Sequence, residues 1–109
     1  MTLALDISLD QRETLLDLLR THLPNTEVWA YGSRTKGNSR PDSDLDLVAF
    51  ATVDQKREVS ALKEAMEESS LSFRVDLFIW DEVPETFRKN ILAEKIVMVA
   101  AQARPWNAI

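Results

Sequence analysis

Apolar residues near the start of the chain recur at the spacing of an amphipathic helix. They are Leu9, Leu15, Leu16, Leu19 and Leu23. Ser8 and Gln11 have the spacing of a capping box at the beginning of this segment, and Pro24 with Asn25 ends it. The pattern predicts a helix over residues 9–22.

Short runs that are apolar and β-prone follow at residues 28–31, 44–50, 72–80 and 95–99. Helical periodicity returns at 53–69, where Val59, Leu62 and Met66 share one stripe, and Pro84 suits the first turn of a helix that runs to about residue 93. This order predicts an α/β (α+β) fold, with a small mixed β-sheet of about four strands and helices that cover one side. We expect one domain over residues 1–102 and a C-terminal tail over 103–109.

Composition narrows the class of protein. The chain has 109 residues, which fits a single domain, and no apolar run approaches the ~20 residues that span a bilayer. It contains no cysteine, which excludes disulfides, thiolate metal sites and a cysteine nucleophile, and we expect a cytoplasmic protein without a signal peptide. Its net charge of −5 argues against direct nucleic-acid binding, because an acidic surface repels a phosphate backbone.

A glycine and a serine, Gly32 and Ser33, follow the predicted strand 28–31 and open a possible helical turn. Glycine allows the backbone to approach a ligand closely, and the free N–H groups at the start of a helical turn favour phosphate. Arg34 and Lys36 lie next in sequence and could contact the same phosphates, although charged loop residues equally often face solvent. Alone, a Gly-Ser pair also fits an ordinary turn.

Asp44 and Asp46 alternate along the predicted strand 44–50, so their side chains share one face. Two neighbouring carboxylates repel each other, and Mg²⁺ with oxygen ligands would compensate the charge. The alternative is a solvated strand edge. A calcium-binding EF-hand loop is excluded, because the glycine and glutamate that it requires are replaced by Leu47 and Val53.

Asp76 lies within the apolar run 72–80, where a charge needs a partner. If that strand pairs with the Asp44–Asp46 strand, three carboxylates converge and could hold two metal ions about 3.5–4 Å apart for an in-line displacement at phosphorus. The alternative is an ion pair of Asp76 with Arg74 or a nearby lysine.

The spacing Gly-Ser-x10-Asp-x-Asp over residues 32–46 resembles the signature of the DNA polymerase β-like nucleotidyltransferase superfamily. The runs around Gly32 and Leu45 look especially like the minimal nucleotidyltransferase (MNT) branch, many members of which are antitoxins paired with a HEPN-domain toxin. The resemblance implies that Gly32 and Ser33 hold a triphosphate, that Asp44 and Asp46 ligate Mg²⁺, and that Asp76 completes the metal site and helps to activate the acceptor hydroxyl.

The resemblance also implies an activity and a partner. Similar antitoxins transfer AMP from ATP to a tyrosine of the toxin and so block its RNase activity. A chain of this length has no separate acceptor-binding domain, which favours an acceptor on another protein; a homo-oligomer is also compatible with the sequence. Two alternatives stay open: a partner-binding module that binds nucleotide without turnover, and a small-molecule nucleotidyltransferase similar to the aminoglycoside-modifying enzymes.

Overall fold

The computed structural model describes residues 5–100, so the predicted tail lies outside the described part of the chain. The elements in chain order are α1 (Leu9–His22), β1 (Val28–Tyr31), η1 (Ser33–Thr35), β2 (Leu45–Ala49), η2 (Val53–Gln55), α2 (Lys56–Glu67), β3 (Val75–Ile79), η3 (Trp80–Glu82), α3 (Glu85–Glu94) and β4 (Ile96–Val99). The η elements are single 3-10 turns. Within the described residues, no helix has the length and hydrophobicity to cross a membrane.

The four strands form one mixed sheet in the order β3-β2-β1-β4, which confirms the predicted fold class. β1 is antiparallel to both β2 and β4, whereas β2 and β3 are parallel and are connected through α2. A parallel pair needs such a crossover, because a short turn cannot return the chain to the same end of the sheet. The crossover brings two strands that are 30 residues apart in sequence into direct contact.

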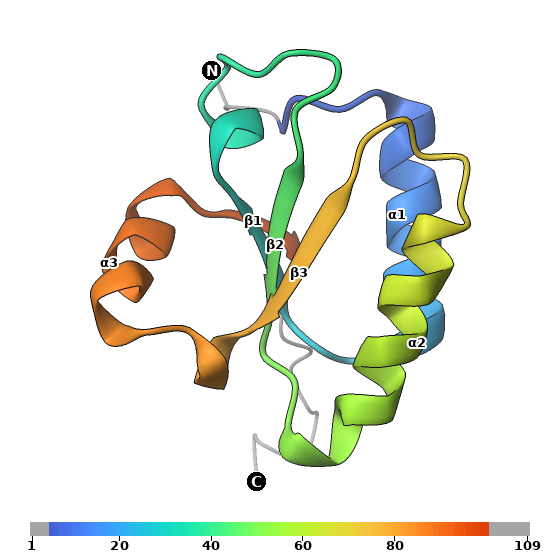
Figure 1. Ribbon diagram of the computed structural model, residues 1–109, viewed down its shortest axis with the longest axis vertical. Helices are drawn as coiled ribbons and strands as arrows, with labels where there is room; N and C mark the ends of the chain where they lie inside the picture. Colours follow the sequence, from blue (N-terminus) through green and yellow to red (C-terminus); the bar gives the residue numbers. More distant parts are fainter. Residues whose placement is uncertain (1–4, 101–109) are drawn as a thin grey trace, which may run out of the picture.

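Alternation along the strands gives the sheet two apolar faces, each covered by helix. Leu45 and Leu47 of β2 and Leu77 of β3 belong to a large core under α1 and α2. Trp29, Tyr31 and Val48 form a smaller core with Val83 and with Ile91 of α3. Figure 1 shows α1 and α2 on one side of the sheet and α3 on the other. The expectation that helices cover only one side was therefore wrong, because Trp29, Tyr31 and Val48 also need cover.

The structure confirms the predicted helix over 9–22 and the strand over 28–31. The capping box also forms, since Ser8 and Gln11 each accept a hydrogen bond from the other's backbone N–H. β3 is shorter than the predicted strand 72–80, because its partner β2 begins at Leu45, opposite Val75. The predicted helix 53–69 opens with the 3-10 turn η2 and is α-helical only from Lys56 to Glu67.

Candidate active site

One row of polar side chains crosses three neighbouring strands on the α3 side of the sheet. Tyr31 of β1 pairs in register with Asp46 of β2, and Asp46 pairs with Asp76 of β3. Because residues opposite each other in a sheet point to the same side, both carboxylates share the face of Tyr31. We call Tyr31, Asp46 and Asp76 the acid row. The sequence analysis left open whether the two aspartate strands pair, and in the structure they do.

The acid row concentrates negative charge with little water to screen it. Burial is the largest cause that raises the pKa of Asp46 to about 6, and the nearby carboxylates of Asp76, Asp44 and Glu94 contribute to this rise in that order. Burial is also the main reason that the pKa of the Tyr31 hydroxyl is raised, with Asp46 and Asp76 adding to the effect. A divalent cation would relieve this repulsion.

The three aspartates do not form a ready-made metal site in this conformation. The Asp76 carboxylate accepts hydrogen bonds from Arg74, with its Oδ1 at 3.1 Å from Nε and 3.0 Å from Nη2. Asp44 is exposed and directly precedes β2. Across residues 5–100, no three His, Cys, Asp or Glu side chains are arranged to hold a metal ion. Asp76 therefore forms the ion pair with Arg74 that the sequence analysis gave as the alternative.

The turn after β1 combines a glycine of positive φ with the start of a 3-10 turn. Gly32 has φ of +88°, which favours glycine, and a Cβ at this position would lie 2.5 Å from Oδ2 of Asp46. η1 begins at the next residue, and Thr35 closes the turn by donating from both its N–H and its Oγ1 to the Gly32 carbonyl. The first N–H groups of such a turn have no partner within it, so Ser33 presents hydrogen-bond donors beside the acid row.

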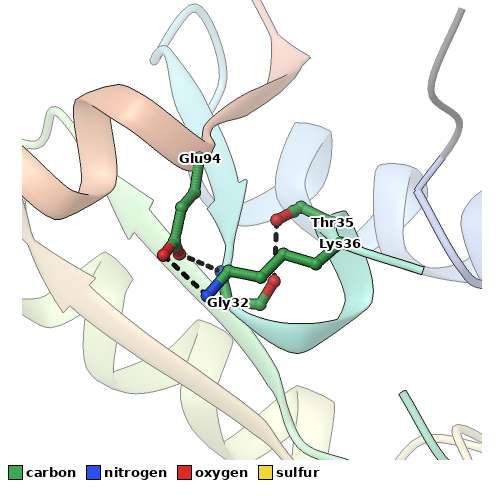
Figure 2. Close-up of polar contacts among 4 residues, drawn as sticks. All are labelled: Gly32, Thr35, Lys36 and Glu94. Atoms are coloured by element: carbon green, nitrogen blue, oxygen red, sulfur yellow. Dashed lines mark hydrogen bonds and ion pairs between the residues drawn. The ribbon is translucent and has the colours of Figure 1, made fainter. Parts of the chain in front are cut away.

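Glu94, at the end of α3, holds this turn in place (Figure 2). Its Oε1 accepts a hydrogen bond from the Gly32 N–H at 3.0 Å, and its Oε2 lies 2.8 Å from Nζ of Lys36. The hydrogen bond from Lys36 lowers the pKa of Glu94 against the opposing effect of burial. The sequence analysis missed Glu94, which lies 62 residues from Gly32. It also did not predict the ion pair of Lys36 with Glu94.

Arg34 has a different role from the phosphate contact expected from the sequence. Its side chain is buried, and its guanidinium donates to the carbonyls of Ser43, Asp6, Arg40 and Pro41 at 2.7–3.2 Å. It also stacks on Phe73, with Cζ 4.2 Å from the ring centroid. Because these bonds use its donors to hold the loop that leads to Asp44, we remove Arg34 from the nucleotide-binding set.

A turn that presents N–H donors beside paired carboxylates has the features that metal-assisted transfer of groups at phosphorus requires. The sequence profile of the family described as "Polymerase beta, Nucleotidyltransferase" matches residues 13–104. The chain is also 37% identical over 97 residues to the Haemophilus influenzae protein described as "Probable protein adenylyltransferase MntA", covering 86% of this chain and 83% of that protein. The chain belongs to the polymerase β nucleotidyltransferase family, as its resemblance predicted.

Two solved structures share the fold. One is described as a toxin-antitoxin with AMP-PNP; it matches with a TM-score of 0.67 and 19% identity, over 84% of this chain and 74% of that chain. The other is described as a tri-AMPylated Shewanella oneidensis HEPN toxin in complex with MNT antitoxin; it matches with a TM-score of 0.58 and 18% identity, over 83% and 70% of the two chains.

Proposed function

We propose that this chain is a cytoplasmic, Mg²⁺-dependent protein adenylyltransferase. It transfers AMP from ATP to a tyrosine hydroxyl of a HEPN-family toxin, releases diphosphate, and thereby acts as the antitoxin. The observation that carries the proposal is the placement of Asp46 and Asp76 in register, directly beside the Gly32–Ser33 turn. Carboxylates and a phosphate-binding turn are both needed to hold a metal–triphosphate complex.

Asp44, Asp46 and Asp76 would hold the magnesium ions. Their carboxylate oxygens are the ligands that Mg²⁺ prefers, and the raised pKa of Asp46 marks uncompensated negative charge at this point. Asp76 has to exchange Arg74 for the metal, and Arg74 is free to leave because its side chain is 72% exposed. Bound magnesium would stabilise charge on the transferred phosphoryl group and on the departing diphosphate.

Ser33 and the N-terminus of η1 would hold the triphosphate, with Gly32 allowing the close approach. Lys36 stays in this proposed set because its Nζ lies at the same turn and its side chain is 49% exposed. In the reaction, the tyrosine oxygen forms a bond to the α-phosphorus while the bond from that phosphorus to the bridging oxygen of diphosphate breaks. The hydroxyl proton is released.

The acceptor is proposed from the relatives. The Haemophilus influenzae protein is described as a protein adenylyltransferase, and it covers most of this chain. The Shewanella oneidensis structure is described as a tri-AMPylated HEPN toxin with an MNT antitoxin, which shares this fold. The structure described with AMP-PNP supports ATP as the nucleotide. Together they favour a protein acceptor over a small molecule.

The test is transfer of label from α-³²P-ATP with Mg²⁺ to the HEPN-family protein co-expressed with this chain. We expect label on the partner with the wild-type chain and a loss of at least about 100-fold with Asp44→Asn/Asp46→Asn. Asp42→Asn is the matched control, because it removes a carboxylate from the same loop at an exposed position and should keep full activity.

Two results would count against the proposal. Absence of label with all four nucleotides, and with Mn²⁺ in place of Mg²⁺, would exclude nucleotidyl transfer to that partner. Protection of cells from the toxin by the Asp44→Asn/Asp46→Asn variant would favour the alternative in which the chain neutralises its partner by complex formation.

A further inference from the structure

A second row of side chains, entirely apolar, lies next to the acid row on the same face of the sheet. It consists of Trp29, Val48 and Phe78, which pair in register one step further along β1, β2 and β3. Each lies two residues from its counterpart in the acid row, a distance of about 6.6 Å along a strand. Trp29 and Val48 are buried, whereas Phe78 remains 47% exposed.

A cavity of about 190 Å³ opens beside Phe78, between the sheet and the start of α3. Its walls are mainly apolar and include Tyr31, Phe78, Val83, Pro84 and Phe87. Phe87 packs edge-on against Tyr31, with ring centroids 6.0 Å apart, yet Phe87 is 43% exposed. The described residues therefore leave two aromatic rings uncovered at a cavity that adjoins the acid row.

The positions of the turn and the cavity relative to the acid row indicate from which side the acceptor hydroxyl approaches. Along the strand direction, the Gly32–Lys36 turn lies on one side of the acid row, because it directly follows Tyr31, and Phe78 lies on the other side, in the row of Trp29 and Val48. The cavity beside Phe78 reaches the acid row at Tyr31, which forms part of its wall. In an in-line displacement, the attacking oxygen and the leaving oxygen are on opposite sides of the phosphorus. If the turn holds the departing diphosphate, the attacking hydroxyl arrives from the side of the cavity.

We propose that this cavity receives the aromatic ring of the acceptor tyrosine, with its hydroxyl directed toward Asp46 and Asp76. This inference rests on the proposed function. An aromatic ring suits apolar walls that contain exposed phenylalanine rings, and edge-to-face contacts with Phe78 and Phe87 would hold it. The ring's single polar atom would then lie at the acid row, where the reaction needs it.

The charge around the cavity favours a particular kind of acceptor segment. Residues 80–85, which connect β3 to α3, carry three acidic residues and no basic one, and the exposed Glu82 contributes to the cavity wall. An acidic rim attracts basic groups and repels acidic ones. The acceptor tyrosine should therefore lie among lysines or arginines on the partner.

Adenine is the competing occupant, and it fits the cavity less well. A purine presents several hydrogen-bonding atoms at its edge, and burying these atoms unpaired carries a cost. Among the side chains that line the cavity, only the Tyr31 hydroxyl and the Glu82 carboxylate are polar. A tyrosine ring has no such atoms along its sides.

The first test uses Phe78→Ala and Phe87→Ala in the full chain, with Leu92→Ala as the matched control. Leu92 lies on α3 and is 50% exposed, but it is not part of the cavity. We expect each phenylalanine variant to raise KM for the HEPN-family partner by about tenfold or more, the effect of truncating a residue at the centre of a binding site. Affinity for Mg·AMP-PNP should change by less than about twofold, and Leu92→Ala should change neither quantity.

The second test needs no transfer, so it separates failure of this inference from failure of the proposed function. NMR would follow the Phe78 and Phe87 ring signals of the wild-type chain, with Mg·AMP-PNP present, during titration with blocked Lys-Tyr-Lys, Glu-Tyr-Glu and Lys-Ser-Lys tripeptides. We expect saturable shifts with Lys-Tyr-Lys, weaker binding of Glu-Tyr-Glu, and no shifts with Lys-Ser-Lys.

Three outcomes would overturn the inference. Loss of Mg·AMP-PNP affinity in the Phe78 and Phe87 variants would assign the cavity to the nucleobase. Unchanged KM for the partner, or ring signals that do not shift with Lys-Tyr-Lys, would show that no acceptor ring enters the cavity.

A different result separates this inference from the proposed function. A wild-type chain that transfers no AMP but shows the expected ring shifts would refute the proposed function and leave the aromatic pocket in place.

Discussion

Asp46→Asn should make the metal-free protein more stable while abolishing its activity. The pKa of Asp46 is raised from an ordinary 3.8 to about 6 by burial and by neighbouring carboxylates. A carboxyl whose pKa is higher in the folded chain binds its proton more tightly there. This tighter proton binding stabilises the fold in full below about pH 4, and the stabilisation is lost as the pH rises through about 6. At neutral pH, the ionised Asp46 therefore destabilises the fold, and asparagine removes that penalty.

The size of the gain follows from the difference between the two pKa values. A shift from 3.8 to about 6 corresponds to about 3 kcal/mol. The side chain of Asp46 is only partly buried, so solvent screens the interaction, and we expect about 1–2 kcal/mol in practice. For a domain of this size, such a gain raises Tm by roughly 5–10 °C.

Thermal and urea unfolding in EDTA, at pH 7.5 and pH 4, would measure this effect. We expect the Asp46→Asn gain at pH 7.5 to shrink toward zero at pH 4, and Asp42→Asn, an exposed control, to show no comparable gain. Added Mg²⁺ should stabilise the wild type and not Asp46→Asn, because only the carboxylate is a ligand. Equal or lower stability of Asp46→Asn at pH 7.5, or a gain that persists at pH 4, would refute the reasoning.

Three further substitutions test the turn and the loop. Glu94→Ala should raise KM for Mg·ATP about tenfold, and Glu94→Gln should raise it less, because glutamine can still accept the hydrogen bond from the Gly32 N–H. Tighter nucleotide binding by these variants would contradict this, because it would mean that Glu94 competes with the phosphates for Gly32 and Lys36. Gly32→Ala should lower both Tm and activity, because its methyl group would meet Oδ2 of Asp46 and φ is positive; unchanged activity would contradict this. Arg34→Lys should lower the free energy of unfolding in urea by about 2–4 kcal/mol, since a buried lysine cannot donate to all of the loop carbonyls that the Arg34 guanidinium binds. A changed KM for ATP with no loss of stability would return Arg34 to the nucleotide site.

The positions of Asp46 and Asp76 could be anticipated from the sequence because both depend on strand alternation. Asp46 lies between Leu45 and Leu47, and Asp76 between Val75 and Leu77, so each aspartate had to face away from the main core. The partner of the Asp76 carboxylate could not be anticipated, because Arg74, directly before β3, and a bound metal ion were both possible partners. Strand alternation therefore determines which side of the sheet Asp76 faces, but it does not determine which cation the carboxylate binds.

The contributions of Glu94, Arg34 and α3 depended on contacts between distant parts of the chain. Glu94 carries no signature of its own, and only the fold brings it to Gly32. An arginine that binds loop carbonyls and one that binds phosphates use the same donors, so Arg34 could not be assigned from its sequence context. The second covered face was missed although the continuous apolar run at residues 28–31 is typical of a strand that is covered on both sides.

Because Asp46 and Asp76 are brought together by the register of β2 with β3, the site depends on whether β3 shifts by an odd or an even number of residues, as well as on the size of the shift. A slip of β3 by one residue would turn Asp76 into the core under α1 and α2 and expose Leu77 in its place. Insertions in residues 50–74 are therefore tolerable only if the strand re-enters in the same register. Variation among related chains should then fall in the loops that flank α2, with the spacing within residues 75–79 unchanged.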